Sequence, residues 1–263
     1  MADSSVTLQR EGAVAFVRID RGDRINALSV AVMEALRDAA RALRSDTDVQ
    51  AVILIGDPVF SAGADLKDPA HTERARAPML ERRELLKLAP DLCAAWEALD
   101  QVTIAAIEGH CIGGALALAV SCDFRIAGAS AHLRLPEIPL GWNLNWNAQP
   151  RFVNLLGPAR AKQLIIFGEA IDPATALQWG LVDAVAPDGE VEGLARAWAA
   201  KVTALPPIAV RMAKRGITQQ ATALNGLAAA MDNDQYLLAS STDDHREALR
   251  AFRERRAPVF VGR

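Results

Sequence analysis

The sequence has few cysteines, and none of them stand at a spacing typical of a structural site. It contains three in 263 residues, Cys93, Cys111 and Cys122. An odd number at uneven intervals argues against a disulfide scaffold and favours a reducing compartment. The intervals also differ from those of metal-ligating cysteines. We therefore predict that all three are small buried residues of the hydrophobic core.

A membrane span, a secretion signal and a strong excess of charge are also missing. The longest apolar stretch, residues 104–120, is interrupted by Glu108, His110 and glycines, whereas a span needs about 20 predominantly apolar residues. The N-terminus lacks both the basic start and the apolar centre of a signal peptide. A net charge of −3 provides no electrostatic reason to expect nucleic acid or an anionic membrane surface. We expect a cytoplasmic protein with neither kind of partner.

Signatures of several common catalytic classes are absent as well. The sequence contains no Ser-His-Asp arrangement, no GxGxxG motif, no Walker loop and no cluster of metal-ligating residues. Hydrophobic residues make up 51% and charged residues 23%, which is typical of a soluble globular protein. The length suits one large domain, or one domain with a small appendage. Any chemistry must therefore depend on other motifs.

Strand-like and helix-like segments alternate along the first part of the chain. Strands are predicted at 14–19, 49–55, 102–107 and 124–127, and helices between them at 26–43 and 72–99. Strands that alternate with helices indicate an α/β core.

Strand signals nearly vanish after Pro158. Asp172 and Pro173 are the residue types of a helix N-cap and first position, and Gly180 is typical of a helix end. Two longer helices are predicted at 206–238 and 243–256. An α/β part is thus followed by a helical C-terminal part.

Two turns of small residues are the most informative features. The apolar strand 102–107 leads to Gly113 and Gly114 at the start of a predicted helix, where free N–H groups favour an oxyanion. The turn at 60–67 follows the apolar run 51–55 in the same way. Each turn alone is also typical of ordinary buried packing. Two such turns can hold one carbonyl oxygen between two backbone donors, as an oxyanion hole does.

Taken together and in order, the motifs resemble the enoyl-CoA hydratase/isomerase (crotonase) superfamily over nearly the whole chain. The motifs that carry this resemblance are Asn26-Ala27-Leu28-Ser29, Ser61-Ala62-Gly63-Ala64-Asp65, Gly109 to Gly114, Cys122-Asp123, Pro136-Glu137 and the tail from Ala251 to Arg263.

The resemblance implies a crotonase-like spiral of ββα units with a helical C-terminal trimerisation region. Residues 1–200 are expected to form the α/β core with the coenzyme A and oxyanion site, and residues 201–263 the oligomerisation region. A homotrimer or a dimer of trimers is expected, and the apolar tail residues Phe252, Pro258 and Phe260 agree with this. The expected ligand is a coenzyme A thioester acting as substrate, with no permanently bound cofactor and no metal.

The resemblance assigns the oxyanion hole to the backbone N–H groups of Ala64 and Gly114, and proton transfer to Glu137. Hydratases of the family carry two carboxylates. Here the first of these positions falls on Ala117, which cannot move a proton, and whether another residue replaces it stays open. If Glu137 does not carry the proton, His110 is the next candidate.

Further residues are expected around the acyl-CoA. Lys67 is a candidate for the coenzyme A phosphates, with a solvated surface lysine as the equal alternative. Arg255 is a candidate for the phosphates of a neighbouring subunit, with a solvated tail charge as its default. At least one of Trp142 and Trp146 is expected to line the acyl pocket, with core packing as the alternative. The full set is Ala27, Ala62, Asp65, Leu66, Lys67, Gly113, Trp142, Trp146, Phe252 and Arg255.

A single carboxylate favours isomerisation of a 3-enoyl-CoA to a 2-enoyl-CoA, because one base can take a proton at C2 and return it at C4. The alternatives are a hydratase that uses Glu137 alone, another thioester reaction such as decarboxylation, hydrolysis or C–C cleavage, and a non-catalytic acyl-CoA binder.

Overall fold

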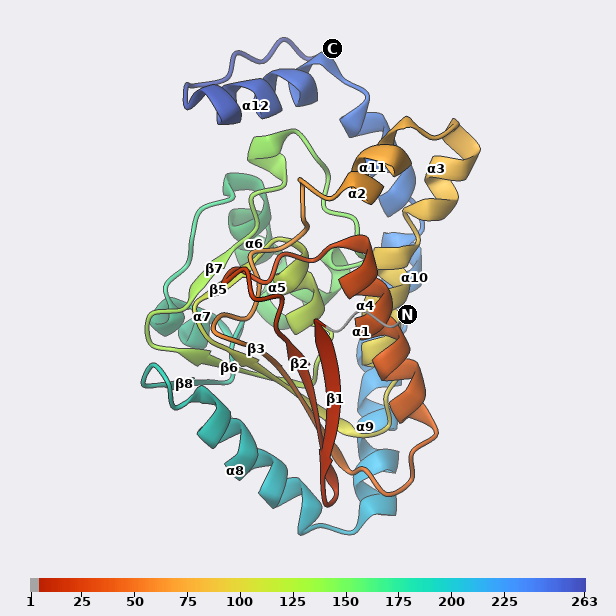
Figure 1. Cartoon of the computed structure of the whole chain (residues 1–263), viewed down its shortest axis with the longest axis vertical. Helices are drawn as coiled ribbons and strands as arrows, with labels where there is room; N and C mark the ends of the chain where they lie inside the picture. The colour runs from red at the N-terminus through yellow and green to blue at the C-terminus, as the bar shows by residue number, and fades with distance from the viewer. Residues whose placement is uncertain (1–4) are drawn as a thin grey trace.

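The computed structural model describes residues 5–263, apart from the side chains of residues 71, 72 and 75, as a mixed α/β structure (Figure 1). A six-stranded sheet has the order β1-β2-β3-β4-β6-β8, and a small second sheet pairs β5 with β7. Among the paired strands of residues 5–263, β1 and β2 are antiparallel and the other pairs are parallel. The strands are β1 (Val6–Glu11), β2 (Val14–Ile19), β3 (Ala51–Gly56), β4 (Val102–Ile107), β5 (His110–Ile112), β6 (Phe124–Gly128), β7 (His132–Arg134) and β8 (Ala184–Ala186).

Helices cover the sheet and make up most of the C-terminal part (Figure 1). Their bounds are α1 (Val30–Arg44), α2 (Pro69–Arg76), α3 (Met79–Leu85), α4 (Leu88–Glu97), α5 (Gly114–Ala119), α6 (Gln149–Phe167), α7 (Pro173–Trp179), α8 (Val191–Thr203), α9 (Pro207–Thr222), α10 (Asn225–Ala229), α11 (Asp232–Ser240) and α12 (Asp243–Glu254).

The central strands are buried on both faces, as their continuous apolar runs predict. Alternate side chains enter two separate hydrophobic clusters, because successive residues of a strand point to opposite faces. Val17 and Leu54 join the cluster that contains α1, α4 and α5. Phe16 and Ile53 join the cluster that contains α8. The three cysteines are buried and free, which confirms their prediction as core residues.

The predicted helices of the first part begin later or break. The helix predicted from residue 26 begins at Val30, because Leu28 forms a bridge with Ala64 and Ser29 is the N-cap, accepting a hydrogen bond from the N–H of Val32. The stretch 72–99 forms three helices instead of one. Pro78 has an extended backbone, which separates α2 from α3.

The C-terminal helices follow the prediction in type but not in continuity. Helix α7 lies where predicted, between the Asp172 cap and Gly180. The range 206–238 divides into α9, α10 and α11. Asn154 of α6 donates its amide to the carbonyl of Ala221 and the side chain of Asn225, so the junction of α9 and α10 is held by a neighbouring helix. The division at residue 200 stays a prediction.

Several elements had no strong signal in the sequence. Strand β1 is exposed along most of its length and has little apolar alternation, while β5, β7 and β8 have three residues each. Helix α6 is kinked at Gly157 and Pro158, and these two residue types in the sequence indicate a helix end rather than one continuous helix. Helix α8 has a stripe of Val191, Ala195 and Ala199, so its apolar spacing was a usable signal.

Asn26 joins the segment before α1 to the loop after β3. Its side-chain Nδ2 donates to the carbonyls of Ile19 (3.0 Å), Asp57 (3.1 Å) and Val59 (2.7 Å), and its Oδ1 accepts from the N–H of Arg21 (3.0 Å). The residue is fully buried with φ +48°, a conformation that asparagine tolerates better than most residues. These bonds hold the chain directly ahead of the turn at 60–65.

Asn26→Ala should lower the free energy of unfolding by about 3 kcal/mol, because it leaves buried carbonyls without donors. Chemical denaturation at a fixed protein concentration measures this loss. Asn154→Ala, which removes an exposed amide, is the matched control and should cost about 1 kcal/mol or less. Equal losses in the two variants would contradict the role of Asn26.

Candidate active site

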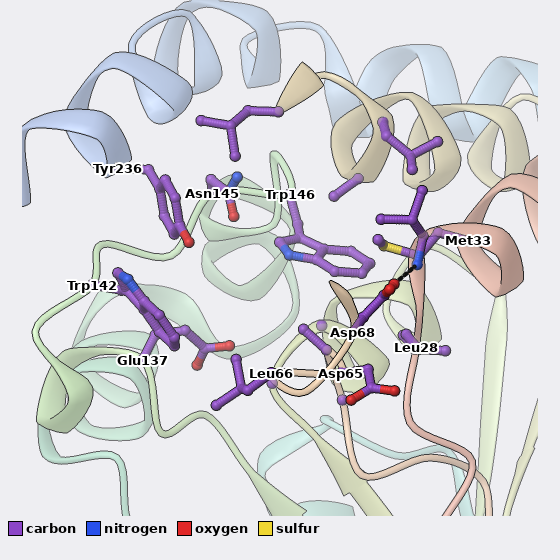
Figure 2. A pocket seen from close by; sticks show the side chains of 18 of the residues that line it. Leu28, Met33, Asp65, Leu66, Asp68, Glu137, Trp142, Asn145, Trp146 and Tyr236 are labelled. Atoms are coloured by element: carbon purple, nitrogen blue, oxygen red, sulfur yellow. Dashed lines mark hydrogen bonds between the residues drawn. The ribbon is translucent and has the colours of Figure 1, made fainter. Parts of the chain in front are cut away.

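A pocket of about 180 Å³ lies between the two small-residue turns, the segment 136–146 and helices that include α11 (Figure 2). Ala62 to Leu66 and Ile112 to Gly114 form one wall. Residues of α1, α3 and α4 form another, and Tyr236 of α11 closes the pocket from above.

The two turns pack directly against each other. The N–H of Ser61 donates to the carbonyl of His110 (2.7 Å), and the N–H of Ile112 donates to the carbonyl of Ser61 (3.2 Å). Gly63 has φ +88°, and a Cβ at this position would lie 2.4 Å from the carbonyl oxygen of Ile112 and 3.7 Å from the nitrogen of Gly114. Only glycine fits this position, and it brings the two turns to one side of the pocket.

Ala64 and Gly114 both belong to the wall of the pocket. Gly114 is the first residue of α5, so its N–H has no partner within the helix. The N–H of Leu28 donates to the carbonyl of Gly63, and the N–H of Asp65 donates to the carbonyl of Leu28. Within the described part of the chain, the N–H of Ala64, between Gly63 and Asp65, has no carbonyl acceptor. Two free donors on adjacent turns can stabilise a developing oxyanion.

Glu137 places its carboxylate beside these turns. A Cβ on Gly113 would lie 2.8 Å from its Oε1. Its Oε2 is buried and has no hydrogen-bond partner among the described residues. Burial raises the pKa of Glu137 to about 7, and the charge of Arg134 offsets only part of this rise. A carboxyl group with this pKa can both accept and donate a proton near neutral pH.

Trp146 packs flat against the start of α5. A Cβ on Gly114 would lie 2.3 Å from its ring, so the indole occupies the space directly over this glycine. Trp146 and Asn147 both have positive φ values. Arg151 holds this strained segment, because it donates to the carbonyl of Asn147 (2.8 Å) and forms a two-bond ion pair with Glu97 (2.7 and 2.9 Å).

A second aromatic group lies on the Glu137 side of the pocket (Figure 2). The ring of Trp142 stacks with that of Tyr236, with 6.1 Å between the ring centroids, and its centroid lies 4.9 Å from that of the His245 ring. His245 Nδ1 is 2.9 Å from the carbonyl oxygen of Leu140, which fixes the ring. Burial raises the pKa of Tyr236 to about 12, so its hydroxyl stays neutral near physiological pH.

Most residues expected around the ligand lie together in the pocket. Asp65 forms an ion pair with Arg21 at 2.8 Å, and hydrogen bonds from Arg21 and the Lys67 N–H lower its pKa despite burial, so it holds the turn in place. The expected residues found in the pocket wall are Ala62, Ala64, Asp65, Leu66, Gly113, Gly114, Glu137, Trp142 and Trp146.

Four expected residues lie outside the wall. Ala27 is buried beneath it and Lys67 is exposed beside it. Phe252, near the end of α12, and Arg255, its C-cap, are exposed and are not among the residues of the pocket wall. Their roles stay predictions.

Ala117 stands at the position of the family's first carboxylate, and His110 is the next candidate for the proton carrier after Glu137. Ala117 is fully buried in α5. His110 is exposed and packs edge-on against the ring of His132, 6.0 Å away. Neither residue belongs to the pocket wall.

Arg82 and Tyr236 line the pocket but were not expected there. Arg82 and Tyr236 come from helices whose sequences carry no motif. A usable signal existed for Tyr236, which is the single tyrosine of the chain.

The described residues contain no group of three or more His, Cys, Asp or Glu side chains placed to hold a metal ion. Within residues 5–263, no helix is long and apolar enough to cross a membrane.

Comparison with known proteins identifies similar sequences over the full length. A family model described as enoyl-CoA hydratase/isomerase matches residues 9–263. The short-chain-enoyl-CoA hydratase of Clostridium acetobutylicum is 32% identical over 96% of both chains, and the crotonyl-CoA hydratase of Syntrophomonas wolfei is 31% identical over all of both. The crystal structure of an enoyl-CoA hydratase from Mycobacterium avium subsp. paratuberculosis is 26% identical, with a TM-score of 0.86 over 98% of this chain and 99% of that one. This match confirms the predicted α/β fold with helices in its C-terminal region.

Glu137→Gln should change the pH dependence of stability. Between about pH 4.5 and 7 the folded protein keeps a proton on Glu137 that the unfolded chain has released, so this carboxyl costs stability as the pH rises. The glutamine variant has no such cost. Its free energy of unfolding relative to the wild type should therefore rise by up to about 3 kcal/mol from pH 4.5 to about pH 8.

Denaturant unfolding of both proteins across this pH range measures the effect. The difference isolates Glu137, because every other titrating group is present in both proteins. A difference that does not change with pH would contradict the burial of an ionisable Glu137.

Proposed function

Because the chain belongs to the enoyl-CoA hydratase/isomerase family, we propose that it converts 3-enoyl-CoA thioesters into 2-enoyl-CoA thioesters, with Glu137 as its single proton carrier. One observation carries the proposal. Of the three carboxylates in the pocket wall, Glu137 alone has a buried oxygen without a partner. Asp65 is paired with Arg21, and Asp68 accepts from the N–H groups of Val30 and Ala70.

The proposed reaction begins when the thioester carbonyl oxygen accepts hydrogen bonds from the N–H groups of Ala64 and Gly114. Glu137 removes a proton from C2, and the electron pair of the broken C–H bond forms a dienolate whose charge lies largely on the carbonyl oxygen. The protonated Glu137 then returns the proton to C4. The double bond has moved from C3–C4 to C2–C3, and the carboxylate is regenerated.

The surroundings of Glu137 favour isomerisation over hydration. Hydration requires a water molecule held beside C3 and activated there. The resembling family uses a second carboxylate for this, and Ala117 stands in its place. The indole of Trp146 also fills the space over Gly114. Hydration with Glu137 alone is the second candidate, and the names of the similar hydratases favour it.

The substrate in this proposal is an acyl-CoA that binds without a permanent cofactor. We assign Lys67 to the coenzyme A phosphates and Phe252 and Arg255 to the site of a neighbouring subunit. The exposed apolar side chains of residues 207–231 support a homotrimer or a dimer of trimers, because a lone subunit leaves so many of them in water. Those more than half exposed are Ile208, Met212, Ile217, Leu224, Leu227 and Met231.

A panel of 3-enoyl-CoA and 2-enoyl-CoA thioesters tests the reaction. Ultraviolet absorbance should increase with the 3-enoyl substrates as the conjugated product forms. Glu137→Gln should lower kcat about 10²–10⁴-fold with substrate binding largely kept. The wild-type kcat/KM should fall as the pH drops below about 7, because Glu137 then carries a proton and cannot act as the base.

Glu169→Gln, an exposed carboxylate outside the pocket, is the matched control and should keep wild-type turnover. Faster loss of the conjugated 2-enoyl substrates than isomerisation of the 3-enoyl ones would favour the hydratase. Wild-type turnover by the Glu137 variant would contradict both candidates.

Sedimentation velocity at micromolar concentration tests the proposed assembly. The mass should be three or six times that of the 28.2 kDa chain. A monomer under these conditions would contradict the proposal.

A further inference from the structure

We propose that Arg82 and Tyr236 form an anion-binding subsite at the acyl end of the pocket, and that the preferred acyl group ends in a carboxylate. This inference rests on the proposed function only in taking the ligand to be an acyl-CoA thioester. It adds a substrate class that the two turns and Glu137 do not specify.

Arg82 is a cation in the pocket wall with no acidic partner. It is half-buried, and its Nη2 donates to the hydroxyl of Ser240 at 2.8 Å. No carboxylate of residues 5–263 lies within 4.0 Å of its guanidinium, whereas the adjacent Arg83 pairs with Asp234 at 2.6 Å. The other arginine of the wall, Arg74, lies 3.6 Å from a glutamate oxygen of α1. Arg82 therefore has charge and donors available for a ligand.

Tyr236 lies beside this guanidinium. Ser240, which Arg82 contacts, follows Tyr236 by four residues on α11, so both occupy the same face of the helix one turn apart. The tyrosine hydroxyl points from α11 into the pocket (Figure 2). It has no hydrogen-bond partner among the described residues, and it is neutral and so can donate. A guanidinium and a phenol that both present donors are suited to an anion.

The position of Tyr236 assigns the subsite to the acyl end of the ligand. The thioester oxygen is placed at Ala64 and Gly114, and the reacting carbons lie at Glu137. Tyr236 stacks on Trp142, which lines the pocket on the Glu137 side, while Asp65 lies across from it (Figure 2). A chain that leaves the turns and passes Glu137 thus reaches Tyr236 and Arg82 with its far end.

A carboxylate fits these groups better than a methyl or hydroxyl end. A methyl group would leave the guanidinium without an acceptor, and a hydroxyl satisfies fewer of its donors. Arginine binds a carboxylate with two parallel hydrogen bonds, and a charge-assisted contact of this kind is expected to favour the matching ligand about tenfold to a hundredfold.

Calorimetric binding of three saturated acyl-CoA thioesters of equal chain length tests the subsite. They end in methyl, hydroxyl and carboxylate, and they cannot undergo isomerisation or hydration, so the result does not depend on which reaction the protein catalyses. The wild type should bind the carboxylate thioester about tenfold to a hundredfold more tightly than the methyl one. Arg82→Gln should reduce this ratio to within about twofold of one, and Tyr236→Phe should reduce it in part.

Arg83→Gln is the matched control, because it removes a neighbouring arginine that pairs with Asp234. This variant should keep the wild-type ratio of affinities for the carboxylate and methyl thioesters. The proposal is overturned if the wild type binds the methyl or hydroxyl thioester as tightly as the carboxylate one. It is also overturned if Arg82→Gln weakens all three equally with the ratio intact, which would assign Arg82 to the coenzyme A phosphates. Failure of all three thioesters to bind would contradict the proposed function itself.

Discussion

The close contact between the turns at 61–65 and 112–114 is the constraint on which the rest of the site depends. The contact requires a glycine at position 63, because a side chain there would collide with the carbonyl of Ile112. It is held from behind by the hydrogen bonds of Ser61 and by the buried amide of Asn26. The parallel strands β3 and β4 deliver both turns to the same edge of the sheet. Ala64 and Gly114, whose N–H groups have no partner in their own turn or helix, therefore both line the pocket.

Burial gives this backbone arrangement its chemistry. Glu137 lies against Gly113 with an oxygen that lacks a partner, and removal from water raises its pKa to about 7. Gly114 is buried as well, and a low-dielectric setting strengthens the attraction between its N–H and any negative charge that develops on a ligand. The partly buried ion pair of Arg151 and Glu97 contributes by holding the strained segment that places Trp146 over the helix start.

The sequence predicted the features that depend on neighbouring residues. Strands β2 and β4 have the predicted bounds, and α7 lies between its predicted cap and Gly180. Features that depend on distant contacts were missed. The long C-terminal helix breaks where side chains of α6 and the pocket segment bond to it, and no local pattern records those bonds. Tyr236 lies on α11, the last of the three helices into which this range divides, and its place in the pocket depends on how α11 packs rather than on a local motif.

The central claim is that one carboxyl group carries the proton from C2 to C4. The most direct measurement is transfer of label during conversion of a 3-enoyl-CoA that carries deuterium at C2, in ordinary water, with the product analysed by mass spectrometry and NMR. Because the Oε2 of Glu137 is buried, a measurable share of the deuterium should appear at C4 of the product in early turnovers. Product with deuterium absent from C4 and a solvent proton there from the first turnovers would contradict transfer of the C2 proton to C4 by Glu137.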